Sequence, residues 1–467
     1  MKLKSLLASL MLFVAVGVIP CKAVDVIPYP QSVEMTEVAF DKANLTNVKY
    51  KKDKKLAPEA YELQIKKDGI VIKSSTDAGR FYAEQTLAQL ADDIVMYCGT
   101  IKDEPRLPWR GLMLDESRHF FGKQEVFRIL DLMGRYKLNR FHWHLSDDQG
   151  WRIEIKAYPN LTTVGGIGCN TDSKAPAKFY TQDDIREIVA YAAEKNIMVI
   201  PEIDMPGHAS AFVRVFPELD GKHRTVNPAS EKLYEVLETI YKELADLFPG
   251  DYLHIGGDEV HKGGWNDLPG MKELMAKENL KSMNEVEDYF GRRLSDIITS
   301  TGKNVVAWDD LIDSGTNPEG KVVMWWRSDQ PQLLGKGVET GFNMVVCPDG
   351  PFYLDYVQDI RDKVGHLVDR QWVNEMKEIY EYELLDDPKV IGAQSNIWTE
   401  KVVTTERLEY MIFPRLIALA EKAWTRTENL NYDCFLKRLA NEYKFLDTYS
   451  LYYYDYRDSM RRVEPRR

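Results

Sequence analysis

Eight short apolar runs are the feature that most constrains the fold of this chain. Each run ends in acidic or aromatic residues, and the runs lie at 110–115, 140–148, 197–204, 252–259, 304–309, 322–326, 343–347 and 390–398. Helical patterns lie between most of them, for example at 124–136, 181–194 and 230–247. Alternating strands and helices are typical of parallel βα units. Eight such units predict an α/β fold in which the strands close into a (β/α)₈ barrel.

One connection in this series is too short for a full helix. Only about a dozen residues, rich in Gly, Pro and Asp, separate the fifth run from the sixth. We therefore expect the barrel helix after strand 5 to be missing or vestigial, and we still favour a barrel over an open doubly wound sheet. No Gly-rich phosphate loop of the GxGxxG or GxxxxGK[ST] type occurs in the sequence, so a nucleotide-binding function loses its main support.

The segments on either side of the runs predict two flanking parts. Residues 24–105 combine short β-like runs, such as 69–72, with one helical pattern at 78–94, which indicates a small α+β domain. The Pro-Arg-Leu-Pro segment at 105–108 marks the boundary between the two parts, and we expect the barrel over 106–428. Residues 429–467 carry one helical pattern around 435–445 and the aromatic run Tyr452-Tyr453-Tyr454, and we expect this tail to pack on the barrel.

The first 23 residues have the layout of a cleavable secretory signal. Lys2 and Lys4 precede an uninterrupted apolar run at 6–18, which Pro20, Cys21 and Ala23 follow. We therefore predict a secreted or periplasmic protein. Lipidation of Cys21 is the less favoured alternative, because Pro20 is a poor neighbour for that processing. No other stretch approaches the roughly 20 apolar residues that span a bilayer.

Charge and cysteine content narrow the function classes. The chain has 73 acidic residues against 61 Lys and Arg, a net charge of −12, and loss of the signal's three lysines takes it to −15. An acidic protein of this kind is a poor partner for nucleic acid or anionic membranes. The cysteines after the signal, Cys98, Cys169, Cys347 and Cys434, are too far apart for a CxxC metal or redox motif, and sequence does not fix whether any of them pair.

The residues that close the eight runs predict the chemistry, because the active site of such a barrel lies at the carboxyl ends of its strands. Carboxylates can bind sugar hydroxyls and move protons in glycosidic cleavage, and flat indole rings stack on the apolar faces of sugars. One acid at a strand end is often only solvated, but a whole ring of carboxylates and tryptophans indicates a carbohydrate site. The set comprises Asp115, Asp147, Asp148, Glu202, Asp204, His208, Asp258, Glu259, Trp308, Asp309, Trp325, Trp326, Tyr353, Asp355, Trp398 and Glu400.

The sharpest motif is His-Ile-Gly-Gly-Asp-Glu at 254–259, in which Asp258 and Glu259 are adjacent. An ordinary retaining glycosidase needs two carboxyl groups about 5 Å apart on either side of the anomeric carbon. Neighbours in sequence are badly placed for that arrangement. One of the two acids could instead protonate the leaving oxygen while the other positions a group of the substrate.

Three motifs together resemble glycoside hydrolase family 20, the β-N-acetylhexosaminidases. They are Arg-Phe-His-Trp-His-Leu-Ser-Asp-Asp-Gln-Gly-Trp at 140–151, Pro-Glu-Ile-Asp-Met-Pro-Gly-His at 201–208 and the Gly-Gly-Asp-Glu run, and the resemblance extends from about Val26 to about Trp424. It implies exo-acting hydrolysis of terminal β-linked GlcNAc or GalNAc with retention of configuration. In that family the 2-acetamido oxygen of the sugar attacks the anomeric carbon and forms an oxazolinium ion, without a cofactor.

The resemblance also implies individual roles. Glu259 would be the general acid and then the base, Asp258 would hold the acetamido N–H, and Tyr353 would donate to the acetamido oxygen. The remaining positions would bind the substrate or support the acid: Arg110, Asp355 and Glu400 at hydroxyls, Trp308, Trp326 and Trp398 as walls, Asp147 and His208 beside the acid, and Trp372 in a less similar stretch. Trp325 and Asp148 adjoin matched positions and could replace Trp326 and Asp147.

Three other functions compete with this one. His142-x-His144 resembles the metal pair of amidohydrolases, but that pair belongs at the first strand and here falls inside the second. A lectin-like protein would bind aminosugars without cleaving them, although the acid Glu259 is present. Release of a disaccharide, as in lacto-N-biosidases, stays open. The expected partner is a glycan with a terminal N-acetylhexosamine, we expect no metal, and a homodimer is possible.

Overall fold

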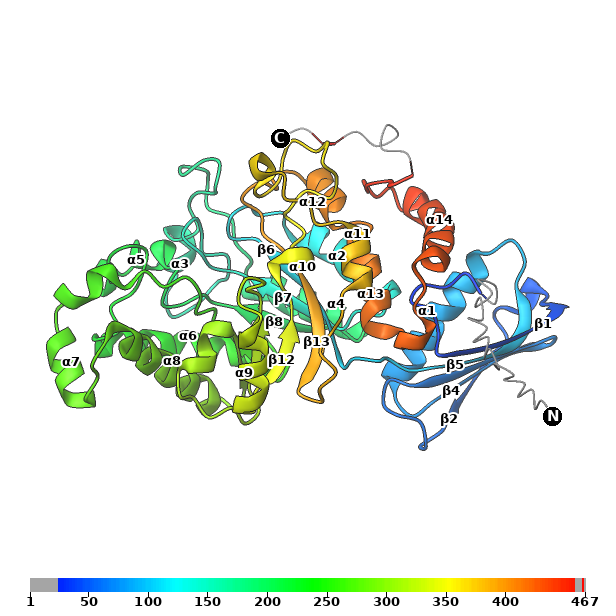
Figure 1. Cartoon of the computed structure of the whole chain (residues 1–467), viewed down its shortest axis with the longest axis horizontal. Coiled ribbons are helices and arrows are strands. Elements are labelled where there is room, and N and C mark those ends of the chain that lie inside the picture. The colour runs from blue at the N-terminus through cyan, green and yellow to red at the C-terminus, as the bar shows by residue number, and fades with distance from the viewer. Residues whose placement is uncertain (1–23, 458–463, 466–467) are drawn as a thin grey trace, which may run out of the picture.

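The computed structural model describes residues 24–457 and 464–465, so the predicted signal at 1–23 lies outside the described residues. Eight parallel strands close into a barrel, as predicted, and they follow one another in chain order around it (Figure 1). The strands are β6 (Trp109–Asp115), β7 (Arg140–His144), β8 (Met198–Glu202), β9 (Tyr252–His254), β10 (Asn304–Trp308), β11 (Val322–Trp325), β12 (Asn343–Val346) and β13 (Val390–Ile397).

Helices follow seven of the eight strands and cover the outside of the barrel. They are α2 (Lys123–Arg135), α4 (Gln182–Glu194), α6 (Glu231–Leu247), α8 (Met283–Ser300), α9 (Gln332–Thr340), α11 (Met376–Glu381) and α13 (Arg415–Trp424). Between β10 and β11 the described chain forms only a 3₁₀ turn, η4 (Asp309–Asp313). The prediction that the helix after the fifth strand is missing is therefore confirmed.

Shorter elements fill the loops, and one long helix follows the barrel. They are α3 (Asn160–Thr163), α5 (Ser210–Val213), α7 (Met271–Glu278), α10 (Asp349–Phe352), α12 (Thr405–Ile412) and α14 (Tyr432–Thr448), with 3₁₀ turns η1 (Lys42–Asn44), η2 (Pro217–Leu219), η3 (Lys262–Asp267), η5 (Val368–Arg370) and η6 (Thr427–Asn429). No helix in the described part of the chain has the length and apolar content that crossing a membrane requires.

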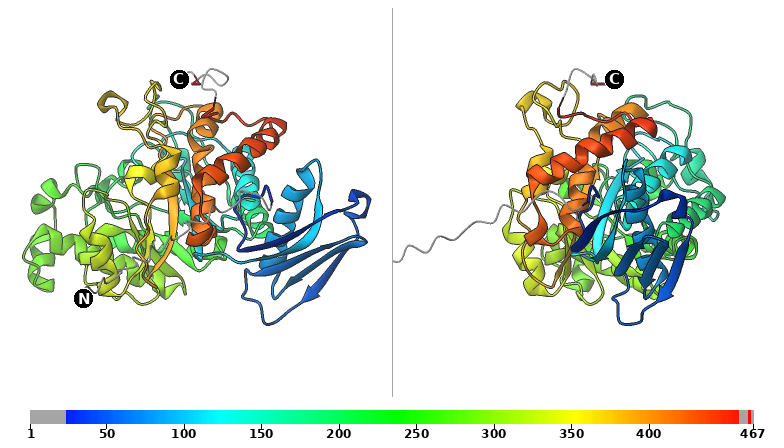
Figure 2. Two further views of the ribbon diagram at one scale, coloured as in Figure 1. Left: turned by 45° about the vertical axis from the view of Figure 1, so that its right-hand side comes forward. Right: turned by 90° about the vertical axis from the view of Figure 1, so that its right-hand side faces the viewer.

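A small α+β domain precedes the barrel. Its sheet has the order β1-β5-β3-β4-β2, with β1 (Ser32–Ala39), β2 (Val48–Lys52), β3 (Tyr61–Lys66), β4 (Gly69–Ser74) and β5 (Tyr97–Asp103). Helix α1 (Asp77–Asp92) packs on β3 and β4. Figure 1 shows this blue sheet at one end of the molecule, and the left view of Figure 2 shows it beside the barrel.

Side-chain caps explain where the predicted helices begin. Thr76 accepts a hydrogen bond from the Gly79 N–H and starts α1, and Thr181 forms a capping box with Asp184 at the start of α4. Asn431 caps α14 in the same way by accepting from the Cys434 N–H. These side chains satisfy backbone donors that the first helical turn leaves unpaired.

The domain interface contains Arg110, which sequence resemblance had placed at the substrate. Arg110 lies near the amino end of β6 and is fully buried. Its Nη2 lies 2.8 Å from Oε1 of Glu59 in the small domain and donates to the Tyr82 hydroxyl at 3.1 Å. The carboxyl ends of the strands lie at the other end of the barrel. The assignment of Arg110 to sugar binding is therefore wrong, and the residue instead ties the two domains together.

We predict that Glu59→Ala destabilises the protein. The change leaves the buried Arg110 guanidinium without its carboxylate, and breaking such a pair costs about 3 kcal/mol of the free energy of unfolding. Urea denaturation measures the effect. Glu62→Ala is a matched control, because Glu62 forms a more exposed ion pair with Lys73 at 2.9 Å and should cost less than about 1 kcal/mol. Equal losses in the two variants would contradict the role given to Arg110.

Candidate active site

Asp147 lies at the centre of the charged groups at the carboxyl ends of the strands. It is buried, and side chains carried by three successive strand ends bind its carboxylate. Arg118 follows β6 and approaches Oδ2 at 2.6 Å, His144 on β7 lies 3.0 Å from the same oxygen, and His208 after β8 lies 3.2 Å from Oδ1. Burial alone would raise the pKa of Asp147, but Arg118 and His208 outweigh it and hold that pKa well below its usual range. Asp147 is therefore a fixed negative charge.

A second buried carboxylate, Glu202, lies below Asp147 inside the barrel. Its Oε2 is 2.6 Å from Nδ1 of His144 and 2.9 Å from Nε2 of His142, and its Oε1 accepts from the Trp308 indole at 2.9 Å. His144 thus bridges two carboxylates with its two nitrogens. Burial would lower the pKa of His144, but Glu202 and Asp147 raise it well above its usual range, so this ring is an imidazolium.

His142 belongs to the same buried network but is neutral. Its Nδ1 is 3.1 Å from the side-chain amide of Gln394, which donates to it, and burial lowers the pKa of the ring. The pair His142-x-His144 therefore serves Glu202 as two hydrogen-bond donors in the barrel core. The interpretation of these histidines as core or supporting residues agrees with their contacts.

Asp147, His208 and Glu259 form a row of alternating charges that leads toward the surface. Nε2 of His208 lies 3.6 Å from Oε2 of Glu259, whose side chain is 54% exposed. Burial would lower the pKa of His208, but Asp147 and Glu259 raise it well above its usual range. The contact with the His208 cation in turn lowers the pKa of Glu259. Glu259 is thus an accessible carboxylate oriented by a fixed cation.

Asp258 and Glu259 follow a Gly-Gly turn and differ in burial. Gly256 and Gly257 have φ of 69° and 102°, and Glu259 itself has φ of 51°. A Cβ on Gly256 would lie 1.9 Å from Oδ1 of Asp204, so only glycine fits there. Asp258 ends up buried, and its Oδ1 has no hydrogen-bond partner among the described residues. Burial raises the pKa of Asp258 to about 6, and its unpartnered Oδ1 can accept a further hydrogen bond.

Aromatic rings form a wall beside these acids. The ring centroids of Trp308 and Trp398 are 6.0 Å apart, those of Trp398 and Tyr353 are 6.2 Å apart, and those of Tyr353 and Trp326 are 6.3 Å apart. The main chain holds Tyr353 against β13, since its neighbour Leu354 donates to the Asn396 carbonyl at 2.7 Å. Four of the sequence-predicted residues thus lie side by side.

Arg118, which the sequence analysis did not select, lies where Arg110 had been expected. Its guanidinium lies 4.8 Å from the Trp398 ring centroid and 3.7 Å from Oε1 of Glu400. Asp355 is buried nearby with an unpartnered Oδ1, and burial together with Glu400 raises its pKa well above the usual range. Arg118, Asp355 and Glu400 therefore form a polar end of the site. Its position three residues after the end of β6 was the signal that could have identified Arg118.

A second residue missed by the sequence analysis, Arg152, fixes the loop at this polar end. Arg152 is buried, and its guanidinium donates to five backbone carbonyls, those of Glu116, Ser117, Gly166, Gly168 and Lys178. The same loop carries Asn170, whose backbone N–H donates to the Arg118 carbonyl and whose side-chain amide donates to the Glu400 carbonyl. Arg152 thereby orders the backbone around both sugar-binding candidates.

The structure shows which residue of two adjacent pairs, Trp325/Trp326 and Asp147/Asp148, lies in the site. It also shows where Trp372 lies. Trp325 points into the core and donates to the Gln330 carbonyl, while Trp326 faces Tyr353. Asp148 accepts from Ser210 and Arg224, so Asp147 and not Asp148 occupies the centre. Trp372 is 42% exposed and lies 5.7 Å from Tyr356 between ring centroids, which places it outside the aromatic wall.

Metal-ligating atoms occur close together in this region. His142, Glu202 and His254 form one such group, and Asp204, His208 and Asp258 form another, with ligand atoms within 4.8 Å of one another in each. Hydrogen bonds already engage both oxygens of Glu202, and the cations His144 and His208 balance the neighbouring carboxylates. The donor set is thus consistent with a charge-balanced hydrogen-bond network, and we assign no metal to it.

Comparisons with known proteins show which family this chain resembles. Residues 107–427 match the family model described as "Glycosyl hydrolase family 20, catalytic domain", and residues 39–104 match the one described as "Glycosyl hydrolase family 20, domain 2". A beta-hexosaminidase of Porphyromonas gingivalis is 34% identical over 85% of this chain and 55% of its own length. A beta-hexosaminidase of Vibrio furnissii is 36% identical over 77% of this chain and 64% of its own length. The chain thus spans about half to two thirds of these relatives.

A solved structure shares the architecture. The crystal structure of the family 20 exo beta-N-acetylglucosaminidase from Vibrio harveyi in complex with N-acetylglucosamine superposes with a TM-score of 0.85 at 30% identity, over 92% of this chain and 78% of that one. The catalytic-domain model alone covers more than half of the sequence. The chain therefore belongs to glycosyl hydrolase family 20.

Proposed function

We propose that this protein is an exo-acting β-N-acetylhexosaminidase that releases terminal β-linked GlcNAc or GalNAc through an oxazolinium intermediate. The single observation that carries the proposal is the pairing of Asp258, buried with one unpartnered oxygen, with the half-exposed Glu259 beside it. The first is suited to holding an N–H group of the substrate, and the second to exchanging a proton with the leaving oxygen.

The first half of the reaction forms one bond to the anomeric carbon and breaks another. The acetamido oxygen attacks that carbon, the bond to the leaving oxygen breaks, and Glu259 gives its proton to the leaving oxygen. Asp258 would accept the acetamido N–H on Oδ1, and the Tyr353 hydroxyl would donate to the acetamido oxygen. The wall of Trp308, Trp326 and Trp398 would enclose the acetamido group and exclude water.

The second half reverses the proton transfer. Glu259, now ionised, removes a proton from water, the water oxygen bonds to the anomeric carbon, and the acetamido oxygen leaves it. Two displacements on opposite faces return the original configuration. His208 supports the ionised form that acts as the base, because its imidazolium stabilises the Glu259 carboxylate. In the free site this contact lowers the pKa of Glu259. A bound sugar would cover the carboxyl and raise that pKa again.

The polar end of the site is suited to the hydroxyls of a terminal sugar. Arg118 has a planar fork of donors, while Asp355 and Glu400 have acceptors. Arg118 is held from behind by Asp115 at 3.2 Å and by Asp147, so its direction is fixed before the sugar arrives. These residues would close the pocket beyond the terminal unit, which favours exo action over release of a disaccharide.

The cellular location and assembly remain proposals from sequence. We propose export to the periplasm or the outside of the cell, where glycans are accessible, on the basis of the signal pattern at 1–23. The homodimer stays a prediction.

Hydrolysis of 4-nitrophenyl β-GlcNAc and 4-nitrophenyl β-glucoside tests the proposed function. We expect cleavage of the first substrate alone, and we expect a thiazoline mimic of the oxazolinium ion to block it. Cleavage of both substrates at similar rates would indicate a nucleophile supplied by the enzyme. Cleavage of neither would contradict the proposed activity.

We predict that Glu259→Gln lowers kcat/KM by about 10²–10⁴-fold for substrates with poor leaving groups, since that is the usual contribution of general acid catalysis. The loss should be smaller for 4-nitrophenyl substrates, whose leaving group needs little protonation. Steady-state kinetics on both substrate types measure it. Glu238→Gln is the control, because Glu238 forms an exposed ion pair with Lys242 on α6. An equal loss on both substrate types would contradict the acid role.

We predict that Asp258 sets the acidic limb of the pH profile. Burial raises the pKa of this carboxyl to about 6, so the form that accepts the acetamido N–H is lost as the pH falls below that value. In the wild type, kcat/KM should drop by about tenfold per pH unit below pH 6. Asp258→Asn should be slow at every pH and lack this limb. Persistence of the same limb in Asp258→Asn would assign it to another group.

We predict that Arg118→Lys raises KM for the sugar substrate by about 10- to 100-fold, because the planar fork is lost while a positive charge remains beside Asp147. Glu59→Ala, which affects Arg110 at the other end of the barrel, should keep kcat/KM within about twofold of the wild type when assayed below its unfolding temperature. A raised KM in Glu59→Ala together with an unchanged KM in Arg118→Lys would contradict the assignment of Arg118, and not Arg110, to sugar binding.

A further inference from the structure

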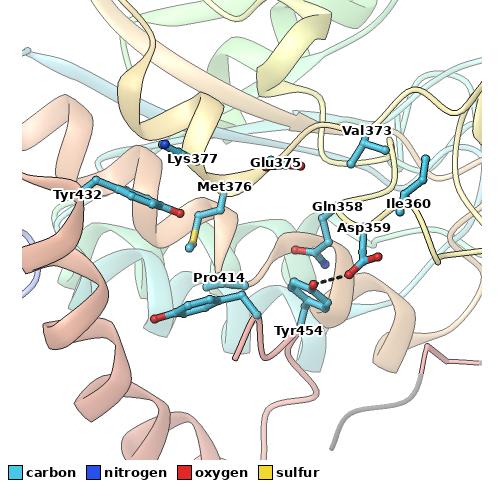
Figure 3. A pocket seen from close by; sticks show the side chains of 11 residues that line it. Gln358, Asp359, Ile360, Val373, Glu375, Met376, Lys377, Pro414, Tyr432 and Tyr454 are labelled. Carbon is cyan, nitrogen blue, oxygen red and sulfur yellow. Dashed lines mark hydrogen bonds between the residues drawn. The ribbon is translucent and has the colours of Figure 1, made fainter. Parts of the chain in front are cut away.

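A second pocket lies outside the barrel mouth, between α11, the corner that joins α12 to α13, and the aromatic tail (Figure 3). It has a volume of about 300 Å³, which is at the lower end of small-molecule sites. Met376, Pro414, Tyr432, Tyr454 and Tyr456 supply its apolar surface. Neither the barrel chemistry nor the domain packing uses this pocket.

Gln358 is the polar side chain built into the pocket. It is only 6% exposed, and its Nε2 donates to the Tyr410 carbonyl at 2.5 Å. That bond fixes the orientation of the amide, because a carbonyl can accept only from the NH₂ end. The other end, Oε1, is buried and has no partner among the described residues. An unpaired buried acceptor is unfavourable, so the site is suited to a ligand that brings an O–H or N–H donor.

Aromatic rings supply the apolar faces that a sugar ring needs. Tyr454 is fixed by a 2.6 Å hydrogen bond from its hydroxyl to Oδ2 of Asp359, drawn in Figure 3. Tyr432 lies across the pocket from it, at the start of α14 and beside Met376. Rigid aromatic faces next to a single directed amide are typical of sites that bind flat, hydroxyl-bearing rings.

The charges around the pocket are balanced, which favours an uncharged ligand. Asp359 forms an ion pair with Arg361 and accepts from Tyr454. The exposed Glu375, the N-cap of α11, and the exposed Lys377 in the first turn of that helix have opposite charges. A phosphate or a carboxylate would find no unpaired cluster of positive charge among these residues.

The pocket is connected to the active site through one segment of chain. Tyr353 and Asp355 line the barrel mouth, and three residues later the same segment reaches Gln358 and Asp359. β-Bridges from Tyr356 to His366 and from Val357 to Val373 stiffen the segment between the two places.

We propose that this pocket binds a neutral saccharide unit and is a second sugar site of the protein. Gln358 Oε1 accepts a hydrogen bond from a hydroxyl or acetamido N–H, and the rings of Tyr432 and Tyr454 contact the sugar face. The choice of a sugar as ligand rests on the proposed function, whereas the need for a neutral donor rests on the pocket alone. A site of this size and polarity should bind a monosaccharide with a dissociation constant of about 1 mM.

Methyl NMR of protein labelled at the methionine methyl groups tests this proposal, because the buried Met376 lines the pocket. The barrel site is first filled with a stoichiometric amount of the thiazoline inhibitor, and GlcNAc or methyl β-glucoside is then added up to about 50 mM. We expect a saturable shift of the Met376 signal, assigned with Met376→Leu, at millimolar sugar. A shift with either sugar supports the site, and a shift with GlcNAc alone identifies the acetamido N–H as the donor.

Three variants locate the binding. Gln358→Leu and Tyr432→Ala should each weaken the titration at least tenfold, and the partly exposed Tyr432 allows a change that does not disturb the core. Gln332→Leu, an exposed glutamine on α9, is the matched control and should bind like the wild type. All three should hydrolyse 4-nitrophenyl β-GlcNAc at wild-type rates, since none touches the barrel mouth.

Two results would overturn the proposal. A Met376 signal that does not move with either sugar would show that the pocket does not bind saccharides, and a titration unchanged in both Gln358→Leu and Tyr432→Ala would place the binding elsewhere. Failure of the proposed function is a separate result: it would appear as absent hydrolysis of 4-nitrophenyl β-GlcNAc, whatever the Met376 signal does.

Discussion

The buried carboxylate of Asp147 is the group on which the rest of the site depends. Arg118, His144 and His208 come from three different strand ends, and without Asp147 each would lose one of its carboxylate partners. From this centre, charges alternate inward to Glu202 and outward to Glu259. Ion pairs thus hold the carboxyl ends of these strands together, at the point where the backbone leaves regular structure.

This arrangement lets two adjacent acids have different properties. Glu259 is exposed and touches the cation His208, so it is ionised in the free site and is suited to exchanging protons when a sugar covers it. Asp258 is enclosed and has one oxygen without a partner, so it is suited to holding a group of the substrate. The backbone makes the difference possible, because Gly256, Gly257 and Glu259 all have positive φ, which takes the chain out of the regular strand at this point. Adjacent acids that cannot flank an anomeric carbon are therefore consistent with a nucleophile supplied by the substrate.

Most of the fold could be predicted from the sequence, and part of the site could not. Strand positions follow from apolar runs, and even the absent helix before β11 follows from a short Gly- and Pro-rich connection. Arg110 was misassigned because the resemblance was matched to the wrong arginine, although Arg110 opens the run at 110–115 and so lies at the amino end of its strand. Arg152 acts through carbonyls that lie up to 36 residues away in sequence, so no local pattern marks it, whereas the position of Arg118 three residues after β6 could have identified that residue. Trp326 and Trp325 differ only in the face of the chain on which they lie, which depends on the backbone after β11. The pocket at Gln358 depends on the tail packing against α11, and periodicity does not determine such a contact.

The central claim is that the substrate's own acetamido oxygen is the nucleophile, and substitution of that group tests it most directly. Fluorine on the acetyl methyl group withdraws electrons from the carbonyl oxygen and changes little else in the sugar. The decisive measurement is kcat/KM of the wild type for 4-nitrophenyl glycosides that carry N-acetyl, N-difluoroacetyl and N-trifluoroacetyl groups. The account predicts a steep, progressive fall in rate along this series. Rates that stay equal across it would contradict participation of the acetamido group and the roles given to Asp258 and Tyr353.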